Sequence, residues 1–447
     1  MPIFAIISVI FINILVNFFP GVRVKFLQRC FIATCVISTI LSCFLFGIVS
    51  NLGALFLLLS GLTFIFVALE TGTSSPKNIG GYINLMLLTY LSLLGCFISR
   101  DLMSFYVFFE VSIIPMFFII LLWGGKEKVL AAKRFFIYTI FGSIFIIIPI
   151  IYLYTVAQSF IPQEIASNNA FITMPSGVKI ALAASMIIGF CVKLPAVPFH
   201  TWLPLAHVQA PTGGSMILAG ILIKLGGYGI IQYVMPIFPA EMLALQDVFI
   251  IIAIISMVYA SFVAMGQKDI KKMIAYSSVA HMAYVLCGIF SMNSLGINGA
   301  IFQMISHGIV SAGLFYMIGL VYSRTHTRNI EDYGNLYEIS PFYAKFFLLL
   351  TMASVGLPGA IGFVGEVLTI LSLAKVSIIY MILLASGCVF GAVYMLHLAR
   401  KLLFGEKFNG DSSLITPMNS YEKVCLYSLG FFVIFLGIYP NVILNLL

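Results

Sequence analysis

Long apolar runs separated by short polar connections are the feature that most restricts how this chain can fold. A helix needs roughly 20 apolar residues to cross a hydrocarbon core about 30 Å thick. Such runs recur from the N-terminal MPIFAIISVIFINILVNFF, which lacks the basic region and cleavage site of a signal peptide, to the C-terminus. We therefore predict an all-α polytopic membrane protein with about fourteen transmembrane helices, over residues 3–19, 31–49, 52–70, 82–99, 102–122, 135–157, 180–204, 212–234, 245–265, 273–291, 296–320, 346–373, 377–399 and 424–446.

The placement of basic residues tests this number of spans. Of the 23 lysines and arginines, 18 fall in or beside the connections that follow odd-numbered spans: Arg23, Lys25, Arg29, Lys77, Lys126, Lys128, Lys133, Arg134, Lys268, Lys271, Lys272, Arg324, Arg328, Lys345, Arg400, Lys401, Lys407 and Lys423. The opposite side has only Arg100, Lys179 and Lys375. Basic loops face the cytoplasm or the mitochondrial matrix, so we expect both termini on the other face. The net charge of +8 is then explained by the orientation of the chain in the membrane, and nucleic acid is not an expected partner.

Six titratable side chains fall inside six different predicted spans. A charge at the bilayer centre costs at least ~2.5–3.5 kcal/mol, and such residues usually mark ion or proton paths. Each alone has a structural interpretation, such as an ion pair that braces two helices or a histidine bonded to a neighbouring carbonyl. A bundle that needs only cohesion can use small residues instead, so the set favours proton transfer through Glu110, Lys193, Lys224, His281, His307 and Glu366.

Prolines predict two broken helices. Pro195 and Pro198 follow Lys193 in the seventh span, and Pro358 precedes Glu366 in the twelfth. Proline removes a backbone donor and clashes with the preceding turn, and such breaks persist at membrane depth only where protein or a wet cavity satisfies the backbone.

The two broken spans occupy the fourth place in two groups of five helices. Because five is odd, the two groups would run with opposite orientation, as in inverted-repeat transporters. We therefore expect three N-terminal helices in 1–81, a first repeat in 82–234, a second repeat in 245–399, and a loop with a final helix in 400–447.

No motif for a cofactor is present. The eight cysteines are scattered through apolar runs without a CxxC pair, and neither GxGxxG nor GxxxxGK[ST] occurs. We expect no metal site and no bound cofactor in this chain.

Five segments between about residues 101 and 370 identify a family: VKLPAVPFHTWLPLAHVQAP, GSMILAGILIKLGGYG, QKDIKKMIAYSSVAHM, MISHGIVSAGLFYMIG and GLPGAIGFVGE. The chain resembles the antiporter-like membrane subunits of NADH:ubiquinone oxidoreductase (respiratory complex I), and among them the chain 4 group. The resemblance implies fourteen helices, inverted repeats and proton translocation along a polar axis. Flavin, iron–sulfur clusters and quinone would belong to partner subunits. The expected partners are other membrane-arm subunits, including neighbouring antiporter-like chains, and lipids.

The resemblance also implies roles along the axis. Glu110 matches the glutamate that modulates the seventh-helix lysine, which corresponds to Lys193. Lys224 matches the connecting lysine of the eighth helix. Glu366 matches the terminal group, where related subunits commonly have lysine.

The two histidines, His281 and His307, match the central positions of the axis. One departure is Gln209, where the family motif usually has glutamate. The composition suits the mitochondrial inner membrane with basic loops in the matrix, and a bacterial plasma membrane is the alternative.

Two other functions stay open at this point. One is a subunit of a multisubunit sodium/proton antiporter, against which Glu366 argues. The other is a scaffold whose buried charges only brace helices.

Overall fold

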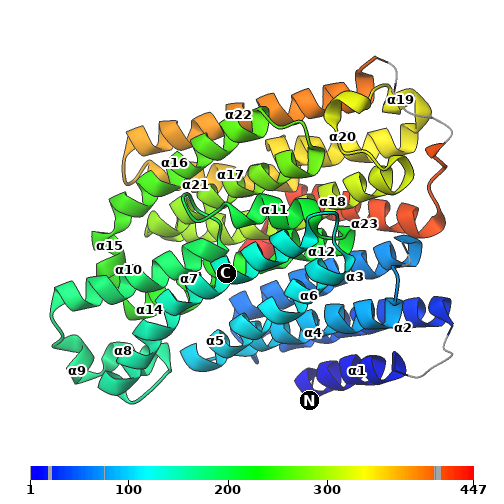
Figure 1. The fold of residues 1–447 in the computed structure, drawn as a ribbon. Coiled ribbons are helices and arrows are strands. Elements are labelled where there is room, and N and C mark those ends of the chain that lie inside the picture. Colours follow the sequence, from blue (N-terminus) through cyan, green and yellow to red (C-terminus); the bar gives the residue numbers. More distant parts are fainter. Residues whose placement is uncertain (1, 19–22, 75, 407, 409–413) are drawn as a thin grey trace.

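The helices of the chain lie side by side with roughly aligned axes in the computed structural model, which describes residues 2–18, 23–74, 76–406, 408 and 414–447 (Figure 1). The predicted end of the first span, Phe19, and the basic residue Lys407 lie outside the described residues. The main helices are α1 (Pro2–Val16), α2 (Val24–Ser42), α3 (Asn51–Ser74), α4 (Ile79–Ile98), α5 (Leu102–Val111), α6 (Ile113–Trp123), α7 (Lys128–Ala157), α10 (Ser176–Lys193), α11 (Trp202–Gln209), α16 (Gln246–Met265), α17 (Ile270–Phe290), α18 (Ser294–Thr325), α20 (Pro341–Val355), α21 (Ile361–Leu373), α22 (Ile378–Phe404) and α23 (Ser420–Ile438).

Shorter elements complete the described part of the chain. The eighth span consists of α12 (Thr212–Ile217), η2 (Leu218–Leu222), α13 (Lys224–Gly229), η3 (Ile230–Val234) and α14 (Met235–Ile237). Connections carry η1 (Cys43–Leu45), α8 (Pro162–Ser167), α9 (Asn169–Ile172), α15 (Pro239–Ala244), η4 (Ile330–Asp332), α19 (Leu336–Ile339) and α24 (Asn441–Leu444).

The predicted set of membrane spans is confirmed. Twelve helical stretches of the described chain are long and apolar enough to cross a membrane, and α1, α20 and α21 are shorter apolar helices. With α20 and α21 taken as one interrupted span, every predicted span has its helix. Large apolar side chains also cover the outer surface, for example Ile137 and Ile379, which are 64% and 67% exposed.

Both predicted helix breaks are present. Helix α10 ends at Lys193, and α11 begins at Trp202 after a non-helical stretch that contains Pro195 and Pro198. In the twelfth span, α20 ends at Val355 and α21 begins at Ile361.

Two glycines make the turn in the twelfth span possible. Gly356 and Gly359, on either side of Leu357 and Pro358, have φ angles of 80° and 89°, a conformation that side chains disfavour. The titratable groups Lys193 and Glu366 therefore lie beside irregular backbone.

The fifth and eighth spans, predicted as regular helices, are irregular in the structure. The fifth is interrupted at Ser112, between α5 and α6. Pro115 explains this break, because a proline cannot bond to the carbonyl four residues before it, here that of Val111. In the eighth span, η2 and η3 are π-helical turns on either side of Lys224, and such turns are frequent at functional sites.

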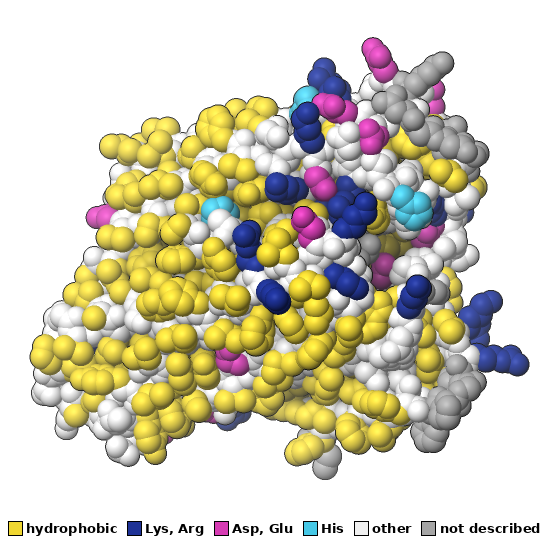
Figure 2. All heavy atoms as spheres, viewed as in Figure 1, with side chains coloured by type: hydrophobic (Ala, Val, Ile, Leu, Met, Phe, Trp, Pro, Cys, Tyr) yellow, Lys and Arg dark blue, Asp and Glu magenta, His cyan; other side chains and the backbone are white. Residues whose placement is uncertain are grey.

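The basic connections lie together at one end of the helices. Trp123 Nε1 donates to the carbonyl of Lys77 at 2.6 Å, and Ile330 N donates to that of Lys268 at 2.8 Å. Arg324 Nη2 lies 2.9 Å from Glu422 Oε2, which joins two further connections. Figure 2 shows most of the visible lysine and arginine side chains in the right half of the view. This arrangement agrees with the alternation on which the number of spans was based.

The boundaries of the four predicted segments, 1–81, 82–234, 245–399 and 400–447, stay predictions. The breaks in α10/α11 and α20/α21 recur at the fourth helix of each five-helix group, which is the arrangement from which the repeats were inferred.

Candidate functional site

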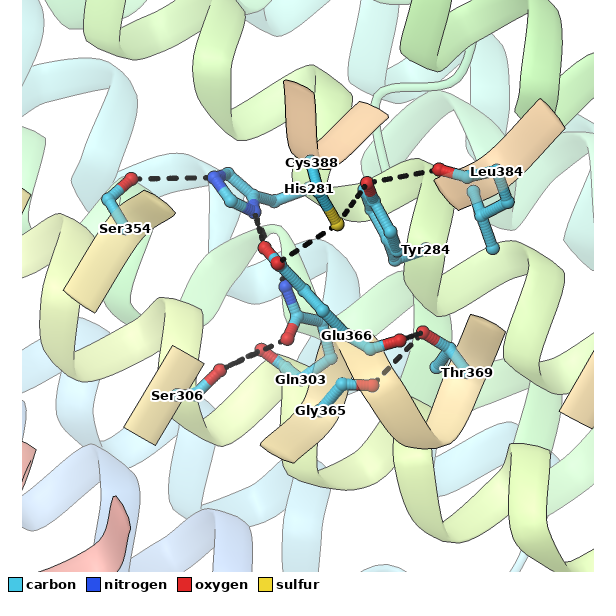
Figure 3. Close-up of polar contacts among 10 residues, drawn as sticks. All are labelled: His281, Tyr284, Gln303, Ser306, Ser354, Gly365, Glu366, Thr369, Leu384 and Cys388. Atoms are coloured by element: carbon cyan, nitrogen blue, oxygen red, sulfur yellow. Dashed lines mark hydrogen bonds and ion pairs between the residues drawn. The ribbon is translucent and has the colours of Figure 1, made fainter. Parts of the chain in front are cut away.

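Four of the six predicted side chains form a chain of contacts through the interior. Lys224 Nζ lies 2.7 Å from His307 Nδ1. The ring of His307 lies 5.5 Å from that of His281, between centroids. His281 Nδ1 in turn lies 3.2 Å from Glu366 Oε1 (Figure 3). The spatial order is therefore Lys224, His307, His281, Glu366, with His307 and not His281 beside the lysine.

Four helices position these side chains. Lys224 begins α13, immediately after the π-helical turn η2, and also donates to the Ala219 carbonyl in that turn. His281 and His307 lie on α17 and α18, which pack against each other, and Glu366 lies on α21 against α18. All four side chains are buried, and Lys224 is 0% exposed.

Polar groups surround the His281–Glu366 end of this series of contacts. Gln303 Nε2 lies 3.3 Å from His281 Nδ1, and Ser354 Oγ lies 3.4 Å from His281 Nε2. Cys388 Sγ lies 3.8 Å from Glu366 Oε2. Figure 3 shows these side chains pointing toward one another from α17, α18, α20, α21 and α22.

A small cavity of about 20 Å³ adjoins both histidines, Gln303 and Glu366. A polar cavity of about this size holds roughly one water molecule. The gap between the two imidazole rings therefore lies beside a place where water can carry a proton between them.

Lys193 and Glu110 lie apart from this chain of contacts. Lys193 Nζ lies 5.0 Å from the ring centre of Phe109 and 5.7 Å from that of Phe135, within the range of cation–π attraction. No ion pair among the described residues joins it to Glu110, and both Lys193 Nζ and Glu110 Oε1 are buried without a hydrogen-bond partner. Because α10 packs against α13, Lys193 occupies the helix next to Lys224.

The arrangement brings together groups that exchange protons. Within the described ranges, no group of three or more His, Cys, Asp or Glu side chains is arranged to hold a metal ion. An amine, two imidazoles and a carboxylate in sequence, each within reach of the next or of a water between them, can pass a proton along the membrane plane.

Several polar residues near the axis were not among the predicted site residues. Gln303 lies four residues before His307, so the helical period placed it on the same face. His207 is fully buried beneath Phe315, with a ring-centre distance of 4.4 Å, and its two ring nitrogens have no hydrogen-bond partner in the described part of the chain. For Cys388 and Ser354 the sequence carries no comparable signal, because the rotation of their helices about the helix axis is set by packing.

Comparisons with known proteins agree with this architecture. Residues 99–392 match the family described as NADH:quinone oxidoreductase/Mrp antiporter, TM. The chain is 42% identical over 397 residues to NADH-quinone oxidoreductase subunit M of Rickettsia conorii, covering 89% of this chain and 80% of that protein. It is 37% identical to NADH-ubiquinone oxidoreductase chain 4 of Chondrus crispus, with the same two coverages.

Solved structures share the fold. A chain of respiratory complex I from Thermus thermophilus superposes with a TM-score of 0.88 at 25% identity, covering all of this chain and 98% of that one. A chain of the Mrp complex from Dietzia superposes with a TM-score of 0.84 at 18% identity, which shows the fold alone. The relatives at 37–42% identity favour the complex I assignment over the antiporter alternative. The chain therefore belongs to the subunit M and chain 4 family of antiporter-like subunits, which carry no redox cofactor, in the proton-pumping membrane arm of NADH-quinone oxidoreductase.

Proposed function

We propose that this chain translocates protons through the axis Lys224–His307–His281–Glu366, with Glu110 and Lys193 controlling its loading. The observation that carries the proposal is the series of four buried side chains from Lys224 to Glu366, with a water-sized cavity beside the one gap, between the two imidazole rings. A proton leaving Lys193 would reach Lys224, pass through the two histidines, and leave by Glu366 toward the face opposite the basic connections.

His281 has the partners that a relay needs. Its Nδ1 atom lies within reach of both the Gln303 amide, a donor, and the Glu366 carboxylate, an acceptor. Without a proton, Nδ1 accepts from Gln303. With a proton, it donates to Glu366. The change of partner would couple the protonation of His281 to the release of a proton by Glu366.

The Glu110–Lys193 pair is suited to receive energy from outside the chain. Moving one charge against 100 mV requires ~2.3 kcal/mol, and two unit charges 4 Å apart interact by ~4 kcal/mol at an effective dielectric of 20. In this structure Lys193 faces aromatic rings instead of pairing with the carboxylate. A helix movement that brings the two groups together would therefore supply energy of the required order.

Glu366→Gln in the assembled enzyme tests the proposal, because glutamine keeps the shape and removes the proton. We expect fewer protons pumped per NADH oxidised in proteoliposomes. Glu241→Gln is the matched control, since Glu241 is also buried, at 8% exposed, but lies in α15 between the eighth and ninth spans. Unaltered pumping by Glu366→Gln with normal NADH oxidation would refute the exit role.

We further propose the finer assignments of place and partners. The chain would lie in the mitochondrial inner membrane, beside neighbouring antiporter-like subunits and lipids, with its basic connections in the matrix and ubiquinone reduced in partner subunits. The chain 4 relatives of Chondrus crispus and Marchantia polymorpha, at 37% and 39% identity, support this, whereas the Rickettsia relatives support a bacterial membrane. Protease protection of the 123–128 connection in mitoplasts, compared with inside-out particles, tests the orientation.

A further inference from the structure

Two clefts indent the basic end of the molecule and meet at one carboxylate. Their volumes are about 480 Å³ and 560 Å³. The first is lined by residues of the 74–79, 123–128 and 208–212 connections, and the second by the ends of α18 and α23. The residues that line both clefts are Glu70, Ser74, Thr212 and Tyr322, so Glu70 is the carboxylate shared by the two.

Glu70 is held at the inner end of these clefts. It lies in the last turn of α3 and is 6% exposed. Its Oε2 atom is buried without a hydrogen-bond partner among the described residues. The first turn of α12 closes over it at Gly213, where an added methyl group would lie 3.2 Å from Glu70 Oε2 and 2.8 Å from the Tyr82 hydroxyl. A buried acid that has one oxygen without a hydrogen-bond partner and borders two open clefts is placed to take up a proton.

No ion pair joins Glu70 to a basic side chain among the residues that the structure describes. Arg324 binds both oxygens of Glu422, and Arg328 pairs with Asp269 at 3.2 Å. Lys271 faces the first cleft, is 3% exposed, and donates to the Ala210 carbonyl at 3.1 Å. Tyr82 lines the first cleft and Tyr316 the second. The two arginines are thus occupied, whereas Lys77 and Lys271 line the first cleft with Glu70, and His326 lines the second.

The helices around Glu70 lead directly to the proposed axis. Thr212 begins the span that carries Lys224, twelve residues and about 18 Å along at 1.5 Å per residue. Lys271 lies in the first turn of α17, ten residues and about 15 Å before His281. A proton on Glu70 is therefore at the basic end of the two spans that carry Lys224 and His281.

We propose that Glu70 is the proton-uptake group of this chain at the basic face. Its carboxylate takes a proton from cleft water and becomes neutral. It then passes that proton inward when the axis has given up its own proton. The proposal rests on the proposed function, because it supplies protons to the same axis.

The test compares Glu70→Gln, Glu70→Asp and Glu70→Gln/Gln209→Glu in the assembled enzyme. Gln209 lines the first cleft, is 6% exposed, and accepts from Glu127 N at 3.1 Å, which one oxygen of a glutamate can also do. We expect Glu70→Gln to lose as many pumped protons per NADH as Glu366→Gln. Glu70→Asp and the double variant should recover part of that loss, which a merely structural role of Glu70 would not produce.

Glu127→Gln is the matched control, because Glu127 is an exposed carboxylate of the same face that lines neither cleft. A second readout is labelling by a water-soluble carbodiimide in inside-out membranes, followed by mass spectrometry. Glu70 should be labelled and Glu366 should not. The inference is overturned if Glu70→Gln pumps normally while Glu366→Gln does not, or if Glu127 is labelled and Glu70 is not. Normal pumping by both variants would instead overturn the proposed function.

Discussion

Replacing Lys224 with arginine separates proton transfer from a structural need for positive charge. Lys224 Nζ lies 2.7 Å from His307 Nδ1. Two unit positive charges at that distance repel by ~6 kcal/mol at an effective dielectric of 20. Each 1.4 kcal/mol is about tenfold in an equilibrium, so double protonation of the pair is disfavoured by roughly 10⁴-fold. The pair should therefore hold one proton, which alternates between the amine and the imidazole.

Arginine cannot be deprotonated in proteins, so Lys224→Arg fixes the charge beside His307. We expect this variant to assemble and to lose the pumping contributed by this chain, as Lys224→Met does. The assay is the number of protons pumped per NADH in proteoliposomes, with assembly checked by NADH oxidation with an artificial acceptor. Full pumping by Lys224→Arg together with loss in Lys224→Met would refute the alternation and favour a bracing charge.

Two further changes test the surroundings of the axis. Phe109→Leu removes one of the two rings beside Lys193 Nζ, and weakens binding of the protonated amine by roughly 0.5–2 kcal/mol. We expect slower pumping with unchanged assembly, and pumping equal to wild type would show that the ring does not matter. Glu422→Ala removes the buried carboxylate that pairs with the half-buried Arg324, and the loss of hydrogen bonds between charged groups costs about 1.5–3 kcal/mol. Thermal unfolding of the purified complex should therefore occur at lower temperature, with Glu422→Gln intermediate, and an unchanged unfolding temperature would contradict this.

Much of the architecture follows from the sequence because the bilayer imposes few choices. Apolar length sets the spans, and the alternation of basic connections sets their number. The hydrogen bonds between basic connections, from Trp123 to Lys77 and from Ile330 to Lys268, support that number. The breaks at Pro195 and Pro358 follow from the missing backbone donor. The break at Ser112 has the same cause, the missing backbone donor of Pro115. It was not predicted, because transmembrane helices often accommodate a proline.

The arrangement within the site was less accessible. The six titratable residues stood out because charge is rare in spans, yet their spatial order depends on helix rotation, which a single sequence does not fix. The π-helical turn η2 beside Lys224 has no proline to mark it, whereas Pro236 lies two residues after η3. Glu70 was not singled out because it lies at the end of an apolar run, where an acid is unremarkable until packing buries it.

The most direct test of the proton axis is a map of the assembled enzyme at a resolution that shows ordered water. The account predicts water between Lys193 and Lys224, which no direct contact joins, and in the cavity beside His281 and His307. Dry, close-packed side chains in both places would contradict it.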